Sequence, residues 1–204
     1  MFSKSQSKRS IFENNQNIFL IVCIRTGIIN HYHAPMTNEL DELLLKPWIG
    51  KDNFLKIIRK HPEYINPLLA ICKTDRAPQA WRAAWLLRHV LRNNDERLGP
   101  HLAEIASVLP GKEDGHQREL LLLIDKAELN EKLCGIVFDK SSEIWQTVSK
   151  KSSTRITAFK LMIKIAGQYP ELQREVNVLS STHYSETLSP GIRKMFFRMI
   201  GNEE

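Results

Sequence analysis

Apolar residues recur every three to four positions along most of the chain after Met36, and runs of strict apolar–polar alternation are absent there. The first pattern is typical of amphipathic helices, whereas alternation would indicate strands, so we predict an all-α fold. Adjacent glycine and proline residues interrupt the helical pattern at residues 99–100, 110–111 and 190–191. Because these two residue types favour turns, we expect helix boundaries near them.

Three long segments, which cover residues 78–92, 113–126 and 153–167, carry only one narrow polar stripe each. A helix with so little polar surface packs against neighbours on several sides, so we expect these three helices to be deeply packed. If Trp85 and Phe159 are buried in them, replacing either residue by alanine costs about 3–5 kcal/mol.

Four segments of the chain align with one another without gaps, and they start at residues 62, 96, 127 and 170. Each segment places large apolar residues at positions i, i+4 and i+7, which lie on one face of a helix. The residues concerned are Tyr64, Leu68 and Ile71, then Leu98, Leu102 and Ile105, then Leu129, Leu133 and Ile136, and finally Leu172, Val176 and Leu179. Internal similarity at such intervals predicts a repeat protein.

A second periodicity runs beside the first. Arg82, Arg118 and Arg155 lie in the first turns of the three long helices, at spacings of 36 and 37 residues. Together the two periodicities predict that a short helix alternates with a longer, more buried one. Neither helix of such a pair can hide its apolar face alone, so the pairs must stack on their neighbours. We therefore predict an α-solenoid of stacked antiparallel helix pairs, in preference to an irregular helical bundle.

Two of the long helices resemble the second helix of a HEAT-like repeat. The stretches that carry the resemblance are Trp81–Leu87, which reads Trp-Arg-Ala-Ala-Trp-Leu-Leu, and Thr154–Ala166, which is soon followed by Tyr-Pro-Glu-Leu. The segment Arg193–Ile200 fits a closing helix. Over roughly residues 40–200 the chain is similar to a family of small bacterial HEAT-like proteins.

The resemblance implies that the second helices line the concave face of a short solenoid. It further implies that one inner surface is shared by Arg82, Arg92, Arg118, Arg155, Lys160 and Lys164, with His89 on the same exposed stripe as Arg82. A basic groove of this kind binds an acidic peptide or a nucleic-acid backbone. The alternative is that these side chains form an ordinary solvated helix face.

The net charge of +6 is unevenly distributed along the chain. Residues 1–35 carry +3, and the remaining residues together carry only another +3. We expect residues 1–35 to be a poorly ordered or non-native N-terminal extension, and residues 36–204 to form the HEAT-like domain. An excess of this size on the domain gives weak support to a nucleic-acid partner.

The cysteines favour a reducing compartment. There are three of them, Cys23, Cys72 and Cys134, and no Cys-x-x-Cys pair occurs. We therefore predict a cytoplasmic protein. The longest fully apolar run, residues 18–24, is far shorter than the roughly 20 residues that cross a bilayer, so we expect no membrane partner.

The sequence contains no catalytic motif that we recognise. Pro110–Gly115 has two glycines and a lysine but lacks the order of a phosphate-binding loop, so we expect a polar loop between helices there. Cys23, His31 and His33 do not have the compact four-ligand spacing of a zinc site. We therefore predict no enzyme activity, no cofactor and no metal.

We predict a non-catalytic interaction scaffold that binds a partner protein or peptide on its concave face. The alternative is a DNA-binding or DNA-repair protein related to the HEAT-like alkylpurine DNA glycosylases. The resemblance to those enzymes implies tryptophan, arginine and a carboxylate on a basic face, and Trp81, Arg82 and Asp75 supply these residue types. Affinity that falls steeply with rising salt would favour the DNA-binding alternative.

Overall fold

Helices joined by turns and short irregular segments make up the described chain, residues 38–47 and 49–201 of a computed structural model, and no strand occurs in these ranges. The all-α prediction is therefore confirmed. The predicted extension of residues 1–35, together with Cys23, His31 and His33, lies outside the described residues.

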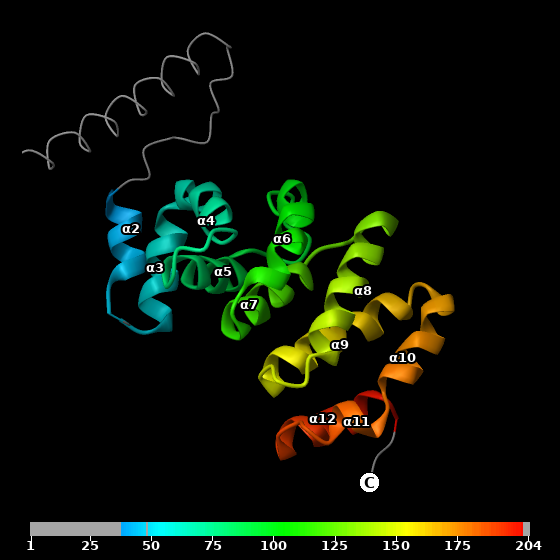
Figure 1. Cartoon of the computed structure of the whole chain (residues 1–204). Coiled ribbons are helices and arrows are strands. Elements are labelled where there is room, and N and C mark those ends of the chain that lie inside the picture. Colours follow the sequence, from blue (N-terminus) through cyan, green and yellow to red (C-terminus); the bar gives the residue numbers. More distant parts are fainter. Residues whose placement is uncertain (1–37, 48, 202–204) are drawn as a thin grey trace, which may run out of the picture. The chain divides into compact units, whose positions relative to one another are not determined.

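Two kinds of helix alternate along the chain (Figure 1). The first helices of the successive pairs are α2 (Asn38–Leu45), α4 (Ile65–Ile71), α6 (Leu102–Val108), α8 (Glu131–Gln146) and α10 (Gln173–Leu179). The second helices are α3 (Lys51–Lys60), α5 (Gln79–Val90), α7 (Asp114–Ile124), α9 (Ser152–Ala166) and α12 (Pro190–Met199). Short connecting elements are the 3-10 turns η1 (Pro62–Tyr64), η2 (Gly99–His101), η3 (Leu109–Gly111) and η4 (Pro170–Leu172), and the helix α11 (Thr182–Ser185).

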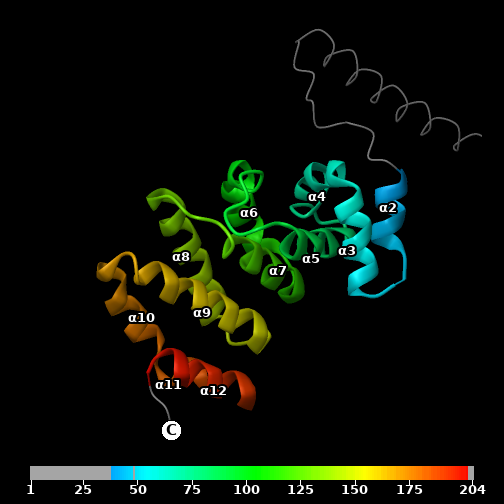
Figure 2. The same ribbon diagram turned by 180° about the vertical axis from the view of Figure 1, so that it is seen from behind.

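The second helices form a row. Each one contacts the next in chain order, from α3 through α5, α7 and α9 to α12, and Figures 1 and 2 show the same order from opposite sides. The first helices α4, α6 and α8 pack on the second helices of their own pairs. Because each pair rests on its neighbours in a row instead of around one common axis, the predicted α-solenoid is confirmed.

Three of the four aligned segments have the same local structure. At η1, η2 and η4 a 3-10 turn with proline near its start leads directly into a short α-helix. Proline is well tolerated there because the N–H group that it lacks would have no partner within the helix. The segment that starts at residue 127 differs, since Asn130 caps α8 by accepting a hydrogen bond from the Leu133 N–H (2.9 Å). No proline or turn follows, so α8 runs for 16 residues, and the prediction of a shorter first helix is wrong for this pair.

The apolar residues of the aligned segments form much of the core. In the two segments that start at residues 62 and 96, all six of these positions are buried, whereas those of the segment at residue 127 are half-buried. Phe159 is fully buried, as predicted, but Trp85 is only half-buried, which corrects the expectation that both belong to the core. Each fully buried leucine or phenylalanine side chain contributes about 1.5–3 kcal/mol to folding.

An aromatic cluster joins α8, α9 and α12. The ring centroid of Trp145 lies 4.4 Å from that of Phe159 and 5.3 Å from that of Phe196, and all three side chains are almost completely buried. The Trp145 Nε1–H also donates a hydrogen bond to the carbonyl oxygen of Leu179 at the end of α10 (2.8 Å). One tryptophan therefore fixes three neighbouring helices around it.

Candidate binding surface on the second helices

The solvent-facing side chains of the second helices form the strongest candidate for a functional surface. Exposed or half-buried positions recur at helical spacing on α5, α7 and α9, and one more lies on α12. We call them the second-helix surface: Trp81, Trp85, Arg88, His89, Arg118, Leu122, Lys160, Lys164 and Met195. Contacts across neighbouring helices, described below, connect these positions from α5 to α12.

The contact between α5 and α7 carries an excess of positive charge. Glu119, which is buried, accepts a hydrogen bond from Arg88 Nε on one oxygen (2.5 Å) and from Arg118 Nη1 on the other (2.8 Å). Two guanidinium groups thus share one carboxylate, and both remain partly open to solvent. One positive charge at this point is left for an outside partner.

A small apolar cavity continues the surface between α7, α9 and α12. Its volume is about 180 Å³, and its lining includes Leu122, Ile156, Met195 and Met199. Lys160 also lines it, is exposed, and forms no ion pair within the described residues. The cavity therefore offers space for one apolar side chain with a free cation at its edge.

Lys164 is tied to its neighbour instead of being free. Its Nζ donates to the carbonyl oxygen of Asp125 (2.7 Å) and to its carboxylate (2.9 Å), so the lysine spans from α9 to the end of α7. A lysine near a helix C-terminus also interacts favourably with the helix dipole. This exposed ion pair supports the stacking of α7 on α9 more than it supports binding.

On α5, an aromatic strip accompanies the cations. Trp81 and Trp85 are both half-buried and lie one turn apart, and the His89 ring lies on that of Trp85 with centroids 4.3 Å apart. The Nδ1–H of His89 donates to the backbone carbonyl of Trp85 (2.8 Å). Burial lowers the pKa of His89, so at neutral pH the ring is an uncharged part of this strip.

Arg155 is not part of any exposed row, which corrects the sequence-based assignment. Its side chain is fully buried under the aromatic cluster, and its guanidinium lies 4.8 Å from the ring centroid of Trp145. Its three nitrogens donate to the carbonyl oxygens of Trp145 (2.9 Å) and Tyr184 (2.7 Å) and to the Thr187 hydroxyl (2.6 Å). Burial lowers the pKa of Arg155, yet a guanidinium stays protonated, so these acceptors hold a buried cation.

Arg82 has a comparable structural role. Its Nη1 donates to the carbonyl oxygens of Leu44 (2.7 Å) and Lys46 (2.5 Å), at the C-terminal end of α2. The last carbonyls of a helix have no partner within the helix, and Arg82 satisfies them from the next pair. Only Arg118, of the three periodic arginines, has its guanidinium on the second-helix surface.

In each of the three central second helices, the side chain that donates to the end of a first helix belongs to the fourth residue of the helix. In α5 and α9 it is Arg82 and Arg155, and in α7 it is Gln117, whose Nε2 donates to the carbonyl of Leu109 just after α6 (2.7 Å). Each of the three side chains thus satisfies a carbonyl at the end of a first helix. Alignment of the three helices on their first residues places Arg82, Gln117 and Arg155 at the same position. Alignment on the arginines instead matches Arg118, one residue further along α7, with Arg82 and Arg155.

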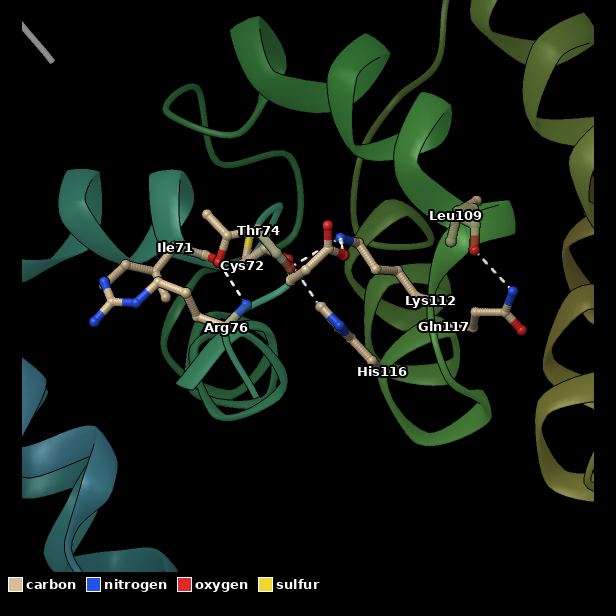
Figure 3. Close-up of polar contacts among 9 residues, drawn as sticks. Ile71, Cys72, Thr74, Arg76, Leu109, Lys112, His116 and Gln117 are labelled. Atoms are coloured by element: carbon tan, nitrogen blue, oxygen red, sulfur yellow. Dashed lines mark hydrogen bonds and ion pairs between the residues drawn. The ribbon is translucent and has the colours of Figure 1, made fainter. Parts of the chain in front are cut away.

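Polar contacts also tie the loop before α5 to the loop before α7 and to the first turn of α7 (Figure 3). Lys112 Nζ donates to the carbonyl oxygen of Thr74 (2.9 Å) and pairs with the Asp75 carboxylate (2.5 Å), while His116 Nε2 donates to the carbonyl oxygen of Cys72 (2.8 Å). Burial lowers the pKa of His116, and the Lys112 ammonium lowers the pKa of Asp75. The expected polar loop at residues 110–115 is therefore part of the packing between pairs.

The next pair repeats this arrangement. The Asp114 carboxylate accepts hydrogen bonds from Lys150 Nζ (3.2 Å) and from the backbone N–H of Lys151 (2.6 Å), and the Thr154 hydroxyl donates to the Asp114 carbonyl (2.8 Å). The bonded residues are 36 to 40 positions apart, in agreement with a repeat in the upper thirties. Sequence reasoning missed Asp114, and the position of this acidic residue three residues after Gly111 is the signal that it begins a second helix.

A second cavity, of about 450 Å³, lies at this edge of the row. Asp75, Trp81, Lys112 and Lys151 are among the residues that line it. It therefore brings together the tryptophan and the carboxylate that the sequence singled out, although Lys112 already occupies one oxygen of the carboxylate. Arg82 does not line this cavity.

Arg92 lies apart from the other predicted cations. It follows α5, is exposed, and lines a cavity with Arg59 from the last turn of α3, beyond the second-helix surface. The predicted inner surface of six cations is thus divided by the structure: Arg118, Lys160 and Lys164 are on the second-helix surface, Arg92 lies at another site, and Arg82 and Arg155 satisfy carbonyl groups.

Comparison with protein families agrees with this architecture. A family model described as a HEAT repeat domain matches residues 38–201, which includes every helix described above. The chain belongs to the HEAT repeat family. No curated protein and no solved structure matched the chain.

The described part of this HEAT repeat chain offers no metal site, since no three His, Cys, Asp or Glu side chains gather there in a way that could hold an ion. No described helix combines the length and the apolar character needed to span a bilayer.

Cys72 and Cys134 are free and buried, and burial raises the pKa of the Cys72 thiol to about 12, which makes it unreactive.

Proposed function

We propose that this HEAT repeat protein is a non-catalytic scaffold that holds a segment of a partner protein on the second-helix surface. The observation that carries the proposal is the cavity between α7, α9 and α12, which joins the exposed Met195 and the half-buried Leu122 and Met199 to the unpaired ammonium of Lys160. The cavity is not filled by side chains that stack the helices, and Met195 at its edge is 41% exposed. Exposed apolar groups edged by polar ones mark sites of interaction.

The chemistry of the surface indicates the chemistry of the partner segment. Arg88 and Arg118 share one carboxylate and Lys160 has none, so the segment is expected to carry acidic residues. An apolar side chain of that segment enters the cavity beside Met195, and the aromatic strip on α5 supplies further contact area. Aromatic residues and arginine are the types that contribute most to binding at protein interfaces.

The test is affinity capture from the native host with three forms of the purified chain: the natural one, a double variant Lys160→Glu/Met195→Glu, and a control, Lys132→Glu/Arg174→Glu. The control changes exposed residues of the first helices α8 and α10 by a comparable amount of charge. We expect the natural chain and the control to retain the same partner and the double variant to lose it. Retention of the partner by the double variant would contradict the proposal.

A nucleic-acid partner is the second candidate, because Asp75 and Trp81 line one cavity. Two features weaken it: Lys112 already binds the Asp75 carboxylate, and Arg82 is engaged with carbonyl groups. Anisotropy of labelled duplex DNA at 50 mM and 200 mM salt distinguishes the two candidates. A DNA binder with six or more phosphate contacts loses roughly a thousandfold in affinity over this range, whereas the scaffold binds DNA weakly at both.

A reducing, cytoplasmic compartment is part of the proposal. The two cysteines of the described chain, Cys72 and Cys134, are buried as free thiols. Disulfides are rare in reducing compartments, where buried cysteines serve as small apolar residues. Labelling of the native protein with a thiol reagent under denaturing conditions, with and without prior reduction, would show whether these thiols are free in the cell.

A further inference from the structure

The cavity that contains Arg92 has the features of a second, separate binding site. Its volume is about 350 Å³, and it lies where α3 and α5 end and the chain turns towards η2. The apolar part of the lining consists of Ile58, Pro62, Ile65 and Val90. The polar part consists of three arginines and one carboxylate: Arg59, Arg92, Arg97 and Asp95.

The carboxylate in this cavity is fully used by one of the arginines. Arg97 Nε and Nη2 donate to the two oxygens of Asp95 (2.9 and 2.8 Å), which is the two-pronged pairing that guanidinium and carboxylate groups favour. These bonds lower the pKa of Asp95, so the pair stays ionised and internally neutral. Arg59 and Arg92 form no ion pair within the described residues, so the cavity retains two positive charges.

Two uncompensated guanidinium groups above an apolar floor match a particular ligand chemistry. A phosphate monoester carries about −1.5 to −2 charges at neutral pH, which nearly neutralises the two unpaired positive charges of the cavity. A simple carboxylate supplies only one negative charge. Guanidinium groups also bind phosphate oxygens in pairs. Pro62 and Val90, the lining residues whose apolar surface is open to solvent, suit an apolar group attached to the phosphate.

We propose that the cavity formed by Arg59, Arg92 and Arg97 binds an aryl phosphate monoester, either as a free small molecule or as a phosphotyrosine side chain. Arg59 and Arg92 contact the phosphate oxygens, and the Arg97–Asp95 pair fixes the loop that closes one side of the cavity. This site shares no residue with the second-helix surface, so it is independent of the proposed scaffold function.

The test is an NMR titration of the full chain at constant ionic strength with phenyl phosphate, benzoate and inorganic phosphate. We expect saturable shifts around residues 58–65 and 90–97 with phenyl phosphate, and binding about tenfold weaker or worse with the other two, which lack the second charge or the ring. Arg59→Gln and Arg92→Gln should each weaken phenyl phosphate binding about tenfold or more, since each removes hydrogen bonds to a charged group. The matched control, Arg174→Gln, changes an exposed arginine of α10 and should bind as the natural chain does.

A short peptide with phosphotyrosine between alanines distinguishes the two sources of the ligand. Binding of both the peptide and phenyl phosphate assigns the cavity to a phosphorylated side chain, and binding of phenyl phosphate alone assigns it to a free small molecule. Absence of saturable binding of phenyl phosphate would overturn the proposal. Equal affinity of the natural chain, Arg59→Gln and Arg92→Gln would overturn it as well.

Discussion

The α5–α7 contact and the α9–α12 contact occupy equivalent places in the row but have different interiors. On α5 and α7 the buried apolar residues are all alanine, leucine or isoleucine, with no aromatic ring among them, and polar contacts from the neighbouring loops tie the two pairs together. At α9 and α12 the interior is filled by large aromatic rings, with the guanidinium of Arg155 beneath them. The row of helices is therefore preserved along the repeat, while the type and size of the side chains buried between successive second helices change.

Two of the periodic arginines, Arg82 and Arg155, also differ in exposure although they occupy the same position of the repeat. Arg82 and Arg155 occupy the fourth position of their helices and both donate to carbonyl groups, but Arg82 is half-buried and Arg155 is fully buried. The difference arises because Arg155 lies under the aromatic cluster, while the Arg82 guanidinium lies against the C-terminal end of the short helix α2. Equivalent register therefore does not imply equivalent exposure.

The largest expected effect comes from the aromatic interior. Phe159→Ala should lower the free energy of unfolding by about 3–5 kcal/mol, because a fully buried ring leaves a cavity between α8, α9 and α12. Trp85→Ala removes a half-buried ring and should cost clearly less. Urea denaturation of both variants measures the two changes in the free energy of unfolding. Equal losses of stability would contradict the expected difference between the α9–α12 contact and the α5–α7 contact.

Arg155 is expected to have the next largest effect. Arg155→Lys should lower the free energy of unfolding by about 2–3 kcal/mol, since an ammonium group cannot reach all three of its acceptors and hydrogen bonds to charged groups are strong. Arg82→Lys, whose site is open to water, should lose less. If Arg155→Lys is as stable as the natural chain in the same denaturation experiment, the buried guanidinium is not holding α9 against the α11 turn.

The polar contact at α5–α7 predicts a dependence on pH. Burial lowers the pKa of His116 in the folded chain, so as the pH falls the unfolded chain takes up the proton first. Stability is therefore fully present above the ordinary histidine pKa of about 6.5 and decreases below it. The melting temperature should fall between pH 7.5 and pH 5.5.

Comparison with His116→Gln isolates this residue. The pKa values of His89 and His101 are lowered in the same direction, chiefly by burial, so the variant should show a smaller decrease but not a flat profile. The aspartates with lowered pKa values lose their contribution only near or below their ordinary pKa, well outside this range of pH. A profile for His116→Gln identical to that of the natural chain would show that the loop contact is not sensitive to protonation.

The smallest expected effect belongs to the exposed part of the row. Arg118→Ala should change the free energy of unfolding by no more than about 0.5 kcal/mol, because Arg88 still pairs with the buried Glu119 after the change. The same substitution should weaken capture of an acidic partner segment. A large loss of stability would place Arg118 among the structural arginines instead of on the binding surface.

Much of the fold could be predicted from the sequence, because it depends on long periodic segments. The predicted stretches 78–92, 113–126 and 153–167 correspond closely to α5, α7 and α9, and the proline after Ser189 begins α12. The length of α8 was not predicted, because alignment on apolar residues does not register that Asn130 caps a helix without a following break.

The candidate site was harder to predict than the fold. A polar stripe on one helix shows which side chains avoid that helix's own core, but it does not show what the neighbouring helices place over them. Arg155, which the HEAT-like resemblance assigned to the inner surface, is instead covered by Trp145 and Tyr184 from the neighbouring helices. The cavity beside Met195 was not anticipated, because it forms only where three separate helices meet.

The most direct test of the row of helices is the amide NMR spectrum of Phe196→Ala compared with that of the natural chain. Phe196 contacts the aromatic cluster of α8 and α9, and α12 packs on α9 at the far end of the row from α3. We predict chemical-shift changes confined to α8 through α12 and an unchanged spectrum for α3, α4 and α5. Shifts of similar size throughout α3, α4 and α5 would contradict the row and indicate helices gathered around a single common core.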